Sequence, residues 1–77
     1  MRVFVNAAAV DVPPGTDVRG AIRALDPALG ARAEAGEALV TDARGIETPL
    51  DSALAAGSIL RVILRARRGD RSGDADA

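Results

Sequence analysis

The sequence predicts one α+β domain, a mixed sheet of four to five strands with one main helix and a disordered C-terminal tail. Apolar and polar residues alternate over 1–6, a period of two that is typical of a half-buried strand. Residues 59–66 are rich in the β-branched residues that favour strands. Between them, residues 18–29 repeat apolar side chains with helical spacing. No large apolar residue occurs from 67 onward, so we expect the domain to span 1–66 and the tail 67–77.

The first two strands are expected to form a hairpin. In the first strand Val3 and Val5 share one face, and Phe4 points to the opposite face. "VDV" at 10–12 alternates in the same way and predicts the second strand, with the turn within 7–9. Two prolines follow at once, and they end the strand because proline cannot donate a hydrogen bond to the sheet.

Helical signals come next. Thr16 is the predicted N-cap of the main helix, whose apolar face carries Val18, Ile22 and Leu25. Asp26-Pro27 interrupts this helix and can begin a second short helical stretch over 27–35, because aspartate caps a helix and proline suits its first position.

The second half returns to strands. "EALVTD" at 37–42 predicts a third strand, and the "DARG" that follows is typical of a type I turn. "IET" at 46–48 can form a short return strand. Residues 49–57 are too few for a packed helix, so we expect a single turn that carries Leu50 and Leu54 into the core.

The order of these elements predicts the topology. The first and last strands are the most apolar, so they are expected to be parallel central neighbours with the helix in their crossover connection. That is a β-grasp arrangement. Its expected core consists of Val3, Val5, Val10, Val12, Val18, Ile22, Leu25, Leu39, Leu50, Leu54, Leu60 and Val62.

Two stretches resemble a known family. "MRVFVN…VDVPPGTDVRGAI" is similar to the start of the sulfur-carrier proteins of thiamin and molybdopterin synthesis, and "LDSALAAGSILRVI" to their end. The last strand also resembles ubiquitin, in the positions of Ser58, Leu60, Leu64, Arg65, Arg67 and Gly69. The resemblance covers about residues 1–69 and implies a ubiquitin-like carrier or protein modifier, with an adenylating enzyme as partner.

The end of the chain departs from that family. The carriers end in Gly-Gly, whereas here the pair is Arg68-Gly69 and eight residues follow. The resemblance therefore implies a pro-form, in which a peptidase removes 70–77 and exposes Gly69 for activation. The alternative for Gly69 is that it is an ordinary glycine in a loose tail. The alternative for the whole protein is a non-conjugated protein-interaction or RNA-associated module, similar to the small β-grasp modules of threonyl-tRNA synthetase and related GTPases.

A partner-binding patch is predicted on the helix-free face of the sheet. Phe4 and Ile63 lie opposite core positions by alternation, Val40 is expected to join them, and Arg61 and Arg65 form a basic rim. An apolar cluster with an arginine rim is typical of interfaces. Arg67 and Arg68 could dock the tail on an acidic partner; the alternative is that these arginines only keep an apolar strand soluble.

Composition argues against several functions. The chain has no His, Cys, Lys or Tyr, so we expect no catalytic residue, cofactor or metal site and no enzyme activity. Its net charge is −1 and Phe4 is its only aromatic residue, which makes nucleic acid an improbable ligand. No apolar run approaches the roughly 20 residues that span a bilayer. We expect a cytoplasmic monomer that does not bind membranes.

Overall fold

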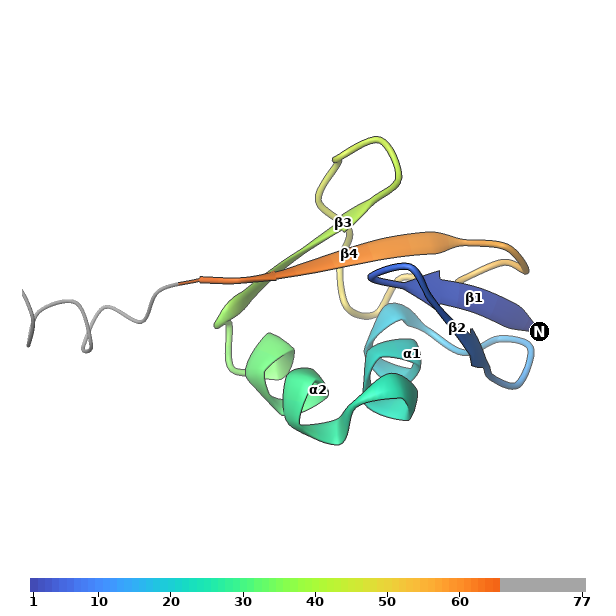
Figure 1. Ribbon diagram of the computed structural model, residues 1–77, viewed down its shortest axis with the longest axis horizontal. Coiled ribbons are helices and arrows are strands. Elements are labelled where there is room, and N and C mark those ends of the chain that lie inside the picture. The colour runs from blue at the N-terminus through green and yellow to red at the C-terminus, as the bar shows by residue number, and fades with distance from the viewer. Residues whose placement is uncertain (66–77) are drawn as a thin grey trace, which may run out of the picture.

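The computed structural model describes residues 1–65 and shows a small mixed α+β fold that is compatible with a β-grasp. The predicted tail and the last residue of the predicted domain lie outside this range. The elements follow one another as β1 (Arg2–Val5), β2 (Ala8–Asp11), α1 (Val18–Leu25), α2 (Pro27–Glu34), β3 (Ala38–Asp42) and β4 (Ile59–Leu64). Both helices lie on one side of the sheet, with α1 nearer β1 and β2 and α2 nearer β3 (Figure 1).

The sheet has the order β2-β1-β4-β3. The expectation of parallel central first and last strands is confirmed, because Phe4 lies beside Ile59 and Val5 beside Leu60. β2 runs antiparallel to β1 on one side, and β3 runs antiparallel to β4 on the other. The apolar strands β1 and β4 are therefore both paired with a neighbouring strand on each side.

The sheet has four strands within residues 1–65, and the predicted return strand at 46–48 is reduced to a single bridge between Thr41 and Glu47. The Asp42 N–H donates to the Ile46 carbonyl at 2.9 Å and the Thr48 N–H to the Val40 carbonyl at 2.9 Å. Pro49 then ends the pairing of this segment with β3, since proline has no N–H to donate.

The second helical stretch expected over 27–35 is present as α2, and it has eight residues, as many as α1, so the domain has two helices of equal length and not one main helix. Asp17 rather than Thr16 caps α1, and its Oδ1 accepts a 2.8 Å hydrogen bond from the Gly20 N–H. Asp26 caps α2 as predicted, with Pro27 at the start of that helix. Aspartate is the better cap at the first site because its position lets the carboxylate reach the third helical N–H.

Gly30 allows the two helices to pack closely. A Cβ atom at this position would lie 2.3 Å from the Cγ atom of Arg23 and 3.1 Å from its Cα atom. The absence of a side chain at Gly30 therefore brings α2 against α1, so that the pair forms one layer beneath the sheet.

The core agrees with the prediction except in β3. Eight of the expected residues are buried, and Leu25, Leu50 and Leu54 pack against them in partly buried positions. In β3, however, Val40 is 4% exposed and lies in the core, whereas the predicted core residue Leu39 does not. Three consecutive apolar residues begin this strand, so its alternation alone is ambiguous. The pairing of Val40 with Val62 and of Leu39 with Ile63 decides the faces.

The first hairpin turns one residue earlier than expected, at Asn6-Ala7 rather than within 7–9. Both residues have positive φ, 51° for Asn6 and 70° for Ala7. A two-residue hairpin turn that follows the right-handed twist of its strands requires this conformation. Asparagine tolerates it, whereas alanine is strained there.

Candidate protein-docking face

The helix-free face of the sheet carries a group of exposed apolar side chains. β4 contributes Ile59 and Ile63, which are 46% and 53% exposed. Phe4 is the neighbour of Ile59 on β1, and Leu39 is the neighbour of Ile63 on β3; both are half-buried. We call these four residues, with Arg61 between the two isoleucines, the docking face.

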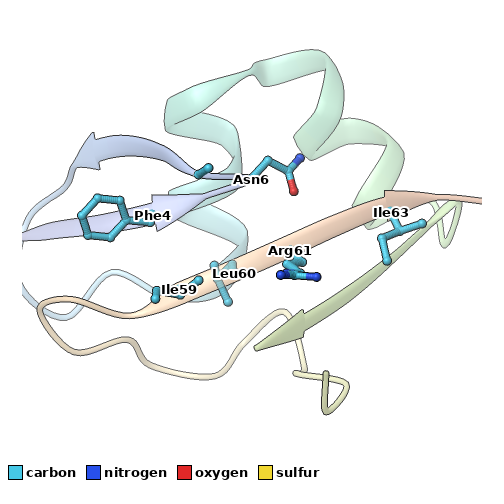
Figure 2. A pocket seen from close by; sticks show the side chains of 7 residues that line it. Phe4, Asn6, Ile59, Leu60, Arg61 and Ile63 are labelled. Carbon is cyan, nitrogen blue, oxygen red and sulfur yellow. The ribbon is translucent and has the colours of Figure 1, made fainter. Parts of the chain in front are cut away.

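An open depression of about 600 Å³ lies on this face. Figure 2 shows it from close by, with Phe4 and Ile59 on one side of Arg61 and Ile63 on the other. Asn6 and Ala7 of the hairpin turn also line it. A depression with mostly apolar walls and one central cation suits an apolar side chain that has an acidic neighbour.

The Asn6 side chain forms one wall of the depression and is also part of the sheet. The backbone N–H of Asn6 donates to the Leu60 carbonyl at 3.0 Å. Its Oδ1 then accepts from the Val62 N–H at 2.9 Å, and its Nδ2 donates to the Val62 carbonyl at 3.4 Å. The carboxamide thus pairs with β4 where β1 has already turned away, and it satisfies backbone groups that would otherwise lack a partner.

The structure brings together Phe4, Arg61 and Ile63 of the predicted patch, with Arg65 one position beyond the end of β4. Val40 does not belong to the patch, because its side chain is buried against the helices. Leu39 takes that place on the helix-free face. Burial of Val40 follows from its pairing with the core residue Val62.

Ile59 was missed as a member of this face, although its alternation with Leu60 could have revealed it. The remaining predicted site residues, Arg67, Arg68 and Gly69, lie outside the described part of the chain, and so does the predicted cleavage point. Residues 1–65 contain no group of acidic side chains that could hold a metal ion. Within the same range no helix is long and apolar enough to cross a membrane.

The turn after β3 contains a carboxylate whose pKa is lowered. The Ile46 N–H, which donates to Asp42 Oδ1 at 3.1 Å, holds the pKa of Asp42 below its ordinary value, with further help from Arg44. Partial desolvation opposes this effect. Because the carboxylate organises the predicted "DARG" turn, its role is structural.

Comparison of the chain with protein-family models, curated proteins and solved structures finds no match in any of the three. We therefore infer the function from the fold and the docking face.

Proposed function

We propose that the protein is a small ubiquitin-like carrier or protein modifier that binds its activating enzyme through the docking face. One observation supports this most directly: the exposed face lies on β4, and Gly69 follows the end of that strand by only five residues. A partner that covers Ile59 and Ile63 is therefore close to the segment on which an activating enzyme would act.

The composition of the chain suits a carrier rather than an enzyme. It has no side-chain amine, thiol or imidazole, so nucleophilic and acid–base chemistry would come from the partner. In this proposal a peptidase cuts between Gly69 and Asp70, and an adenylating enzyme in the cytoplasm then activates the new carboxylate. Arg67 and Arg68 would contact acidic groups beside the enzyme's channel.

A second candidate is a non-conjugated binding module. The docking face would serve this function equally well, because it needs no free carboxylate. Arg68 favours this candidate, since the related carriers have glycine at that position and a large side chain obstructs a narrow channel.

Intact-mass analysis of the protein isolated from its native cells separates the two candidates. Loss of 70–77 supports the carrier, and a Gly69→Val variant should then stay full length because the cut follows this residue. A Gly73→Val variant is the matched control in the same segment and should be processed like wild type. A full-length wild-type chain, in cells whose peptidase is active, would rule out the carrier in this form.

A further inference from the structure

We propose that the docking face binds an acidic polypeptide segment in which one carboxylate lies between two apolar side chains. This inference rests on the proposed function, because it names the chemistry of the partner for the same face. It follows from the ion pairs of the arginines and from the place of one arginine within the apolar group.

The arginines of the described chain fall into two classes. Five of the seven arginines in residues 1–65 have a carboxylate oxygen within 4.0 Å: Arg2, Arg19, Arg23, Arg32 and Arg44. Arg61 and Arg65 are the two in this range for which the structure has no ion pair, and both side chains are exposed on or just after β4. Among the residues the structure describes, the arginines without an ion pair thus occur only within the docking face and just beyond the end of β4.

Arg61 occupies the middle of the face and not its rim. It alternates with Ile59 and Ile63 along β4, at about 7 Å between successive side chains on one face. Figure 2 shows its guanidinium group between these neighbours. A partner that covers both isoleucines must also remove water from Arg61. A desolvated charge without a counter-ion is strongly unfavourable, so the partner has to supply a carboxylate at that point.

The same charge argues against the other occupants. Two copies of the chain stacked face to face would bring two unpaired Arg61 side chains into the centre of one interface, where like charges repel. A nucleic acid could offer phosphates to Arg61, but its bases bind mainly by stacking on aromatic side chains, and Phe4 is the only aromatic residue of the chain. An acidic polypeptide with flanking apolar residues satisfies both parts of the face.

Selection from a phage-displayed random-peptide library tests this inference. The full chain is the bait, and the Phe4→Ala/Ile63→Ala double variant removes peptides that bind elsewhere. We expect enriched peptides to share an acidic residue between two apolar ones, and to shift the NMR signals of Ile59, Arg61 and Ile63.

Charge reversal then identifies the contact. Arg61→Glu should weaken binding of a selected peptide about tenfold or more, and replacing the shared acidic residue by lysine should restore binding to this variant. Arg23→Glu on α1 is the matched control, because it makes the same change in net charge in the helix layer and should leave affinity nearly unchanged.

The outcomes separate the inference from the proposed function. Peptides that bind this face without a shared acidic residue overturn the partner chemistry but leave the docking face intact. Failure of every peptide to perturb the face argues against both. Concentration-dependent shifts of the same signals without peptide, or tighter binding of an RNA oligonucleotide than of any peptide, also overturn the inference.

Discussion

The two faces of β4 contain similar aliphatic side chains in very different surroundings. Leu60 and Val62 are 2% and 7% exposed beneath the helices, whereas Ile59 and Ile63 on the opposite face are 46% and 53% exposed. Composition therefore does not distinguish the faces. The position of α1 and α2 does, because both lie on the same side of the sheet (Figure 1). An isoleucine that no helix covers is available for a partner.

The largest expected effect comes from truncation on the covered face. Leu60→Ala should lower the free energy of unfolding by about 2–5 kcal/mol, because it removes a fully buried side chain and leaves a cavity. Ile63→Ala on the open face should change it by no more than about 0.5 kcal/mol. Urea unfolding of both variants measures the difference. Equal losses would mean that the two faces do not differ as described.

A smaller effect is expected at Asn6, which links the hairpin turn to β4. Asn6→Gly keeps a residue that accepts positive φ but removes both side-chain bonds to Val62. We expect a loss of about 1–2 kcal/mol in unfolding free energy and faster hydrogen exchange at the Val62 amide. Asn6→Asp is the matched control, because it retains the acceptor for the Val62 N–H and should show intermediate exchange. Unchanged exchange in Asn6→Gly would contradict this role.

A change of opposite sign is expected at Ala7, which lines the depression on the open face. Ala7 has a φ of 70°, where glycine lacks the steric penalty of alanine. Ala7→Gly should therefore raise the unfolding free energy by about 0.5 kcal/mol. Ala9→Gly in the extended part of the same hairpin should lower it, since glycine weakens a strand. Thermal unfolding compares the pair, and a destabilised Ala7→Gly would show that the turn is not strained.

The last prediction concerns the turn at the end of β3. The pKa of Asp42 is lowered on folding, so its ionised form stabilises the native state. That contribution is complete above the unfolded pKa and is lost as pH falls through the folded pKa. Asp42→Asn should be less stable than wild type at neutral pH, and the difference should shrink on acidification below about pH 4. A difference that is independent of pH would contradict the assigned role of the carboxylate.

Most of the fold could be predicted because its signals are local. Alternation identified β1, and the strand propensity of its Ile and Val residues identified β4. The Asp26-Pro27 pair identified the start of α2, and "DARG" identified the turn after β3. The errors occurred where local signals were ambiguous. Thr16 and Asp17 are both good caps, and the apolar run that begins β3 fits either choice of face.

The candidate site was predicted in part for the same reason. Phe4 and Ile63 were assigned to the open face from alternation within their own strands. Val40 was assigned wrongly, because its face depends on its pairing with Val62 on another strand. The bond between Asn6 and Val62 joins residues 56 positions apart, and no pattern of adjacent residues indicates it.

Local chemistry in the chain was enough to predict most of the elements and their order. Alternation, helix caps and proline act over a few neighbouring residues, so these signals can be recognised in the sequence alone. The tertiary structure decided the register of β3, the equal length of the two helices and the exposure of Ile59 beside Arg61. These depend on contacts between segments distant in sequence, in which Gly30 admits one helix against the other and the paired helices cover one face only.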